Sequence, residues 1–148
     1  MPNWCENIVS VYGPEEVLAL FKERAKEGDV PLSFTKLYPI PEELKEDWYT
    51  WNVDHWGTKW DLDEGTKVIY DEPTQIIYRF DTAWSPPEAL FAHASGMFPD
   101  LTFQGSYSEP GMDFSGSFVH GNAETYPEVD LPSASSFVGM GMNAWEPY

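Results

Sequence analysis

Five segments of the chain alternate apolar and polar residues, which is the period-two pattern of strands that bury one face. They cover residues 5–12, 66–71, 74–81, 101–107 and 112–120. Glu72-Pro73 separates the second and third segments, and Glu109-Pro110-Gly111 separates the last two. Because Pro and Gly are typical of turns, the pattern predicts one strand near the start of the chain and two β-hairpins after it.

Two other segments place apolar residues at the spacing of an amphipathic helix. The first begins after Pro14 and ends at Gly28. Its apolar face holds Val17, Leu18, Phe21 and Ala25. The second begins at Ser85-Pro86 and ends before Pro99. Its apolar face holds Ala89, Leu90, His93, Ala94 and Met97. Proline at the start and glycine or proline at the end are the usual boundaries of a helix.

The segment between the first helix and the first hairpin, about 30–62, is predicted to be an insertion. Prolines interrupt its first part, so we expect an irregular or edge segment over 30–40. A short helical turn is expected at 41–45. The next stretch, 48–61, reads WYTWNVDHWGTKWD and holds four of the seven tryptophans. Its aromatic residues share one helical face up to Trp56, and Gly57 is expected to end that helix.

The predicted order is strand, helix, insertion, strand, strand, helix, strand, strand. This order is typical of the split βαβ, or ferredoxin-like, α+β fold, in which two helices cover one face of an antiparallel sheet. Residues 1–121 are therefore predicted to form one ferredoxin-like domain. Residues 122–148 are rich in Pro, Ser and Gly, and they are predicted to form an irregular, extended acidic tail.

Charge is the strongest deviation in composition, with 25 acidic residues against eight Lys and Arg and a formal net charge of −17. Arg79 is the last basic residue, so the second half of the chain carries carboxylates alone. Affinity for nucleic acid comes mainly from Lys and Arg, which argues against direct nucleic-acid binding. The same charge argues against anionic membranes and favours a protein partner with a basic surface.

Cys5 is the only cysteine, which excludes an internal disulfide and indicates a reducing compartment. No stretch has the roughly 20 apolar residues that a membrane helix needs, and the start of the chain lacks the pattern of a signal peptide. We therefore expect a soluble cytoplasmic protein of a bacterial host. No pattern bears on its oligomeric state.

The tryptophan-rich insertion supplies the candidate binding residues. They are Trp51, His55, Trp56, Lys59, Trp60 and Trp84. One interpretation is a binding or hydrolytic pocket lined by indoles around His55, since a histidine titrates near neutrality. Another is an aromatic minicore that packs on the sheet face left open by the two helices. A third is that some rings of the wider set, which also includes Trp4 and Trp48, remain exposed as anchors for a protein partner. Lys59 is expected to pair with Asp54, Asp61 or Asp63, or to stack on an indole.

No metal, cofactor or catalytic nucleophile is predicted. Asp61, Asp63 and Glu72 match three positions of a calcium loop, but the required glycine comes one place early, at Gly65. The three histidines lack zinc-site spacing, and the glycines near the end of the chain lack the context of a phosphate loop. Cys5 lies in a predicted strand, where burial would raise its pKa and make it structural rather than reactive.

Four motifs resemble a known family. They are MPNWCEN at the start, WNVDHWGTKWD in the insertion, TAWSPP before the second helix and YSEPGMDFSG in the last hairpin. Together they resemble the YubB-like family of small phage and plasmid proteins. The resemblance covers residues 1 to about 121, and it implies a ferredoxin-like domain in a bacterial protein of a mobile element. It implies no catalytic residues.

Three functional hypotheses follow. The first is a non-enzymatic accessory protein of a mobile element that binds a host or defence protein through its acidic surface, one form of which is mimicry of nucleic acid. The second is a small-molecule-binding or hydrolytic protein that uses the tryptophan-lined pocket around His55. The third is a minor structural or assembly component. The charge pattern favours the first.

Overall fold

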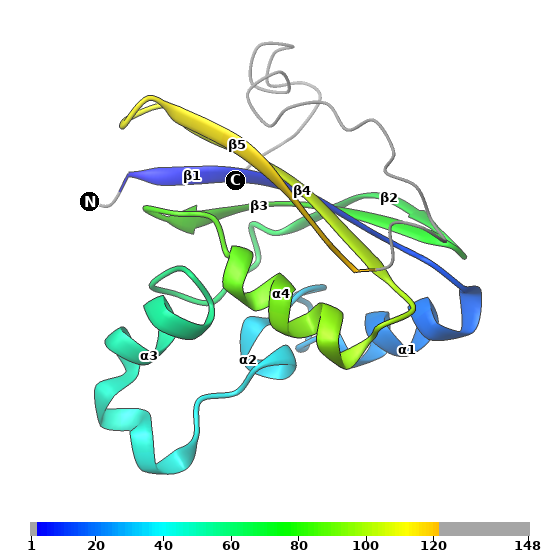
Figure 1. Ribbon diagram of the computed structural model, residues 1–148, viewed down its shortest axis with the longest axis horizontal. Helices are drawn as coiled ribbons and strands as arrows, with labels where there is room; N and C mark the ends of the chain where they lie inside the picture. Colours follow the sequence, from blue (N-terminus) through cyan, green and yellow to red (C-terminus); the bar gives the residue numbers. More distant parts are fainter. Residues whose placement is uncertain (1–2, 122–148) are drawn as a thin grey trace.

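The computed structural model describes residues 3–121, which form an antiparallel sheet with helices on one face (Figure 1). The strands are β1 (Trp4–Tyr12), β2 (Lys67–Glu72), β3 (Gln75–Ala83), β4 (Thr102–Glu109) and β5 (Phe114–Gly121). The helices are α1 (Glu15–Ala25), α2 (Phe34–Leu37), α3 (Trp48–His55) and α4 (Glu88–Met97), with a 3-10 helix, η1 (Glu42–Asp47), before α3. None of these helices is long and apolar enough to cross a membrane.

The strand order in the described part is β2-β3-β1-β4-β5, and every neighbouring pair is antiparallel. The connection from β1 to β2 skips over β3, and the connection from β3 to β4 skips over β1. These two interlocked crossovers define the split βαβ arrangement. The predicted ferredoxin-like fold is therefore confirmed, with β5 added beyond β4 as a fifth strand.

The core lies between the sheet and the helices. Val9 and Val11 of β1 face it, and their neighbours Tyr78 and Phe103 on β3 and β4 do the same. Phe34 of α2 is central, because its ring lies within 5.6 to 6.5 Å of three other core rings. Those rings belong to Trp56, Phe80 and Phe91. Each such aromatic side chain buries on the order of 150 to 250 Å², so this cluster supplies much of the hydrophobic stabilisation.

Two glycine–aromatic pairs join β4 to β5. Gly105 lies opposite Phe118, and Gly116 lies opposite Tyr107. In each pair the aromatic ring covers the glycine so closely that a methyl group would not fit between them. An aromatic ring over a strand glycine shields the exposed backbone and fixes the register of the two strands.

The insertion differs from its prediction in position. The minicore interpretation places its tryptophans on the open face of the sheet, but Trp51 and Trp56 belong to the main core on the helix side. Figure 1 shows α3 beside α4, on the same side of the sheet as α1 and α2. The reason is that α2, inside the segment expected to be irregular, brings Phe34 into the core and leads the chain onto that side.

Most local predictions hold with small shifts. Trp48–His55 forms the predicted helix, and Gly57 ends it with a φ of 91°. The first helix ends at Ala25 rather than at Gly28, which instead lies in the turn between the bridged residues Glu27 and Val30. The predicted tail at 122–148 lies outside the described residues.

Candidate binding site

Asp61, the last residue of the WGTKWD sequence, holds α2 in place. Its Oδ1 accepts hydrogen bonds from the backbone N–H groups of Phe34 and Leu62, both at 2.7 Å. Its Oδ2 accepts from the Thr35 N–H at 3.0 Å and from the Ser33 hydroxyl at 3.1 Å. A carboxylate that satisfies the free N–H groups at a helix start is a strong cap. Asp61 therefore has a structural role.

Three more polar groups in and just before this motif also bind backbone atoms. The Trp56 indole N–H donates to the Tyr38 carbonyl at 2.8 Å, and the Thr58 hydroxyl donates to the Ala83 carbonyl at 2.8 Å. The Asn52 side-chain amide donates to the Lys59 carbonyl at 2.8 Å. These bonds fasten the insertion to the end of β3 and to the preceding loop.

Gly57 connects this motif to the TAWSPP sequence. Its carbonyl accepts a 2.5 Å hydrogen bond from the Ser85 hydroxyl. A Cβ at this position would lie 3.0 Å from the Pro86 carbonyl oxygen, and the φ of 91° is one that residues with side chains rarely adopt. The glycine is therefore required by the close approach of two distant segments, in addition to ending α3.

His55 packs against aromatic rings, and within residues 3–121 no ion pair joins it to a carboxylate. Its ring stacks on Trp51 at 4.3 Å, and its Nδ1 lies 2.9 Å from the Trp51 carbonyl oxygen. Tyr38 contacts His55 edge-on and stacks on His93 at 3.5 Å. Burial, and after it the proximity of Arg24 and His55, lowers the pKa of His93. This is the surrounding of a structural histidine pair rather than of a general base.

Lys59 and Trp60, by contrast, lie on the surface. The Lys59 ammonium is 4.6 Å from the centre of the Trp60 ring and 5.0 Å from that of Tyr49. Of the two contacts expected for Lys59, the structure contains the cation–π contact with an indole. Trp84 lies apart from these two residues and is 47% exposed, with a backbone φ of 73°. Its backbone N–H donates to the Asn3 carbonyl.

The six residues predicted as one binding site are thus divided among three places. Trp51 and Trp56 are buried in the core, with the half-buried His55 stacked on Trp51. The half-buried Lys59 lies against the exposed Trp60, and Trp84 lies beyond the end of β3. The structure brings only Lys59 and Trp60 together at an accessible site.

A continuous row of exposed aromatic rings extends on either side of this pair. Trp48 stacks on Tyr49 at 5.9 Å, and Trp4 of β1 lies 6.2 Å from Trp60. We call Trp48, Tyr49, Lys59, Trp60 and Trp4 the aromatic row. Its four rings are between 39% and 53% exposed. Trp4 is not one of the six predicted site residues, because the pairing of β1 with β3, which sequence spacing does not show, brings it to the insertion.

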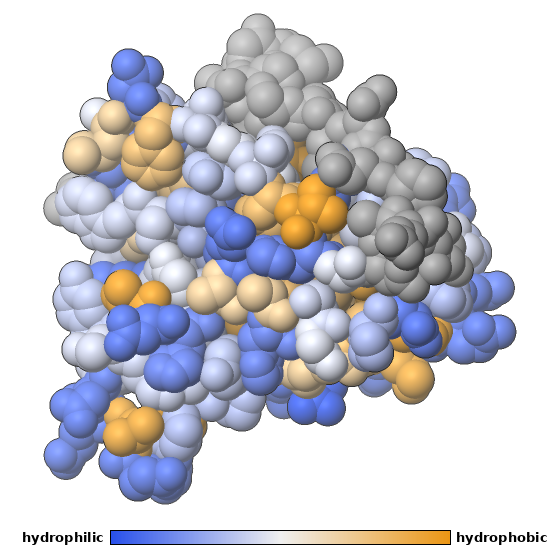
Figure 2. Space-filling model, in the orientation of Figure 1, coloured by the Kyte–Doolittle hydropathy of each residue, from blue (hydrophilic) through white to orange (hydrophobic). Residues whose placement is uncertain are grey.

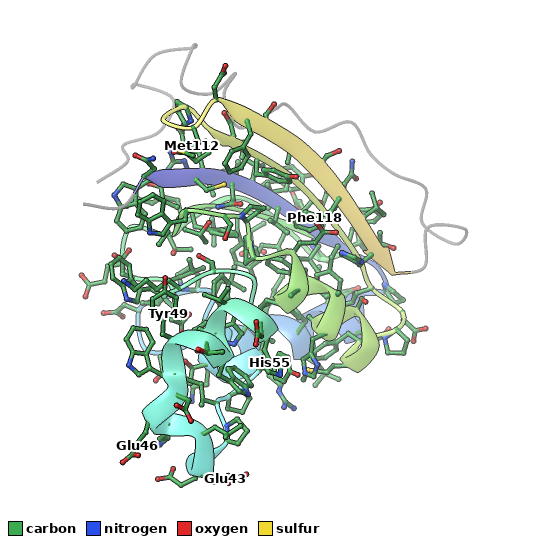
Figure 3. All side chains as sticks on the ribbon, turned by 60° about the vertical axis from the view of Figure 1, so that its left-hand side comes forward. Glu43, Glu46, Tyr49, His55, Met112 and Phe118 are labelled. Atoms are coloured by element: carbon green, nitrogen blue, oxygen red, sulfur yellow. The ribbon has the colours of Figure 1, made fainter. Side chains whose placement is uncertain are left out.

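The aromatic row begins on an acidic arm, formed by η1 and α3. Every residue of η1 is exposed, and four of its six residues are Glu or Asp. Figure 3 shows Glu43 and Glu46 pointing outward from the end of this arm, with Tyr49 further along it. Figure 2 shows the arm as a protrusion on which a small apolar patch is surrounded by hydrophilic residues.

At its other end the aromatic row opens into two adjoining cavities. The inner one is about 220 Å³, and its lining includes Trp4, Trp60, Asp63 and Asp81. The outer one is about 680 Å³, and its lining adds Val30, Glu64, Gly65 and Lys67. Trp4, Asp63 and Asp81 line both. We refer to the pair as the Trp4 cavity.

Asp81 is the most perturbed acid of this cavity. Burial raises its pKa to about 6, and the negative charges of Glu6 and Asp63 act in the same direction. The buried Arg79 opposes the rise, since its Nη1 lies 3.1 Å from Asp81 Oδ1, although without the alignment of a hydrogen bond. Arg79 also pairs with Glu6 at 3.4 Å. A carboxyl with a perturbed pKa in a cavity marks a candidate site.

The described lining of this cavity contains no His or Cys side chain. Burial raises the pKa of the Cys5 thiol to about 12, which keeps it protonated. Within residues 3–121, no group of three or more His, Cys, Asp or Glu side chains is placed to hold a metal ion. The chemistry that the cavity offers is therefore aromatic and carboxylate contact.

Comparison with protein-family models identifies one family. The model described as the ferredoxin-like domain in Api92-like protein matches residues 55–136, which is more than half of the chain. The chain belongs to the Api92-like family. This result supports the expected ferredoxin-like domain, while the YubB-like family named from the four motifs is not the one that the comparison finds.

A solved structure agrees with this assignment at the level of fold. The crystal structure of a protein api92 from Yersinia pseudotuberculosis superposes with a TM-score of 0.61 at 9% sequence identity. The alignment covers 90% of this chain and 99% of that one. No curated protein matches the sequence. At this identity the likeness shows the shared Api92-like fold.

The fold also explains two of the motifs in this Api92-like chain. WNVDHWGTKWD contributes core tryptophans and, through Asp61, the cap of α2. Two hydrogen bonds join it to TAWSPP, one from Thr58 to the Ala83 carbonyl and one from Ser85 to the Gly57 carbonyl. Most of these residues are thus required by the structure. The residues of these motifs that stay accessible include Trp60 and the half-buried Lys59, whose side chains contact each other.

Proposed function

We propose that this Api92-like protein is a non-enzymatic binding protein that recognises a basic segment of a protein partner. The observation that carries the proposal is the aromatic row, whose exposed rings continue from an acidic arm. Tryptophan and tyrosine are the residues most enriched at binding hot spots. Surrounding carboxylates steer a basic partner toward the rings and reject acidic ones.

The acidic arm is better suited to this role than the carboxylates beyond Arg79. In that part of the described chain, Asp81 lines the Trp4 cavity, and Glu109 is buried and accepts a hydrogen bond from the Met112 N–H. Glu88, Asp100 and Asp113 are exposed, but they lie at the start of α4, after its end and in the β4–β5 turn. The carboxylates of η1 are exposed and lie next to Trp48 and Tyr49. Charge and apolar contact are therefore available on one surface.

Nucleic acid is not the proposed ligand, although exposed rings can stack on bases. Such binding also needs a basic groove along the phosphates, and the chain has eight cations against 25 carboxylates. The proposal keeps the setting implied by the sequence resemblance, an accessory protein of a bacterial mobile element that binds a host or defence protein. Mimicry of nucleic acid is one way in which an acidic surface would bind such a target.

The alternative of an enzyme site around His55 has no geometry in its favour, because this histidine packs between Trp51 and Tyr38. The alternative of a structural or assembly component has no specific observation that favours it over the binding proposal.

Affinity capture with a matched control tests the proposal. The protein, the double variant Trp48→Ala/Tyr49→Ala and the control Tyr70→Ala are immobilised and exposed to a bacterial lysate. Tyr70 is 45% exposed on β2, so it matches the row in exposure but lies elsewhere. Retained proteins are identified and purified, and their affinity is measured directly at about 0.05 and about 0.3 M salt, which differ strongly in charge screening.

We expect a basic protein that binds the wild type and Tyr70→Ala equally. Its dissociation constant should rise at least about tenfold in the double variant, as expected for loss of hot-spot rings, and it should also rise with salt. Competition with duplex DNA for the same protein would identify mimicry. The proposal fails if the retained proteins are not basic, or if the double variant binds them as well as Tyr70→Ala does.

A further inference from the structure

The Trp4 cavity has the size to receive one side chain and the chain that carries it. Pockets for whole cofactors and drug-sized ligands measure about 300 to 1,000 Å³. The inner cavity, at about 220 Å³, is smaller than this and suits the end group of a single side chain. The outer cavity, at about 680 Å³, lies within that range and has room for the backbone that carries such a side chain.

The aromatic row already holds a cation from the chain itself. Lys59 lies over both Trp60 and Tyr49, at distances where a ring attracts a positive charge. Trp4 continues the row from Trp60 into the cavity and is 43% exposed. Trp4 thus extends the rings that hold Lys59 and forms part of the wall of both cavities.

The carboxylates of the lining make the cavity favourable for a positive charge. Asp63 and Glu64 are exposed at its edge, and Asp81 lies deeper. Lys67 and Arg79 act against them, Lys67 as part of the lining and Arg79 through its contact with Asp81. The outer lining contains three carboxylates and one ammonium group, so its net formal charge is negative.

Trp4 and these carboxylates together match a planar organic cation better than a compact one. A guanidinium group stacks flat on an indole and at the same time donates to a carboxylate with its edge. It is also less strongly hydrated than an ammonium, so it enters a half-enclosed cavity at lower cost. We infer that the Trp4 cavity binds a guanidinium group, supplied by an arginine side chain of the basic partner. This assignment of the side chain rests on the proposed function, whereas the cavity chemistry does not.

The test uses a free probe and its neutral isostere. Nα-acetyl-arginine amide and Nα-acetyl-citrulline amide have nearly the same shape, but only the first is charged. Binding to the full chain is followed through the indole N–H signals in NMR spectra. The first probe should bind weakly, with a dissociation constant on the order of 1 mM, as expected for one stacked and paired cation. The citrulline probe should bind at least about fivefold more weakly.

Two sets of variants assign the binding to the cavity. Asp63→Asn/Glu64→Gln removes two charges from its edge, and Trp4→Leu removes the ring. Glu16→Gln/Glu23→Gln removes the same charge from the exposed side of α1 and serves as the control. The first two variants should weaken binding of the arginine probe at least about fivefold, while the control should not change it.

Equal binding of the two probes, or unchanged binding in both cavity variants, overturns the inference while leaving the aromatic row and the proposed function intact. Discrimination between the probes, lost in the variants, supports it. A captured partner that loses affinity for Asp63→Asn/Glu64→Gln assigns the guanidinium to a protein arginine. If the probe binds but no basic partner is found, the proposed function fails and the cavity remains a site for free guanidinium compounds.

Discussion

Asp61 and Asp63 lie two residues apart in one loop, and their surroundings give them different roles. Asp61 accepts hydrogen bonds at the start of α2, so its charge is satisfied inside the protein. Asp63 accepts one local hydrogen bond from the Gly65 N–H and faces the Trp4 cavity. The hydrogen-bond donors around each carboxylate therefore decide that Asp61 stabilises the fold, whereas Asp63 stays accessible in the cavity lining.

Asp81 is expected to make stability depend on pH. Its pKa is about 6 in the folded chain against an ordinary value of 3.8. The folded state therefore binds this proton more tightly, so the contribution of Asp81 is stabilising below about pH 4 and is lost as the pH rises through about 6. The groups that face it are Glu6 on β1, Arg79 on β3, Asp63 in the loop and Lys67 on β2.

We predict that Asp81→Asn gains stability relative to the wild type between about pH 4 and about pH 8. The relative gain should be about 2 to 3 kcal/mol, from a shift of about two pKa units. Urea unfolding at both pH values measures it. Asp54→Asn, which changes an exposed carboxylate, should alter stability by less than about 0.5 kcal/mol at either pH. A difference between Asp81→Asn and wild type that does not vary with pH would contradict the prediction.

At the scale of elements, α2 is a short helix on which the position of the insertion depends. It has only four residues, too few to be stable alone, and its Phe34 contacts Trp56, Phe80 and Phe91. Its start is held by Asp61, which lies 27 residues further along the chain than Phe34. A distant cap and core packing therefore stabilise a helix that propensity alone would not predict.

Asp61→Asn should destabilise the protein by about 2 to 3 kcal/mol, because the amide nitrogen would face hydrogen-bond donors and the charge at the helix start would be lost. Chemical unfolding measures the change. Asp63→Asn is the matched control, since an asparagine accepts the Gly65 N–H equally well, and it should change stability by less than about 0.5 kcal/mol. Equal effects of the two substitutions would show that Asp61 does not cap α2.

At the scale of the whole molecule, the formal charge of −17 acts against compactness, because like charges are brought together on folding. The described ion pairs, such as Lys22–Asp71 at 2.6 Å and Arg79–Asp81 at 3.1 Å, offset only part of this repulsion. Salt screens the remainder over a distance of about 10 Å at 0.1 M.

Added sodium chloride should therefore stabilise the protein, by on the order of 1 kcal/mol between about 0.02 and about 0.3 M. The urea midpoint of unfolding measures this at each concentration. The variant Glu42→Gln/Glu43→Gln/Glu46→Gln, in which three exposed charges of η1 are removed, should show a smaller increase. Stability that falls with salt would mean that the ion pairs outweigh the net repulsion.

The sequence by itself determined the fold class and most elements. The signals for these elements are local: alternation in the strands, helical spacing after Pro14 and Ser85, and proline or glycine at the turns. Local signals can be recognised in the sequence without the tertiary structure. The charge pattern led only to a hypothesis about the partner, a protein with a basic surface. His55 was singled out for its chemistry, but the aromatic rings of Trp51 and Tyr38 that surround it decide that it is structural.

Only the tertiary structure decided which tryptophans are accessible and what lies next to them. Trp51 and Trp60 have the same side chain and belong to the same sequence motif, yet one is buried and the other exposed. Trp4 and Asp81 lie near Asp63 only because β1 pairs with β3 and the loop after the insertion returns to that end of the two strands. The physical reason is that hydrogen-bonded strand pairing and core packing join residues far apart in sequence, and neither composition nor spacing records those contacts.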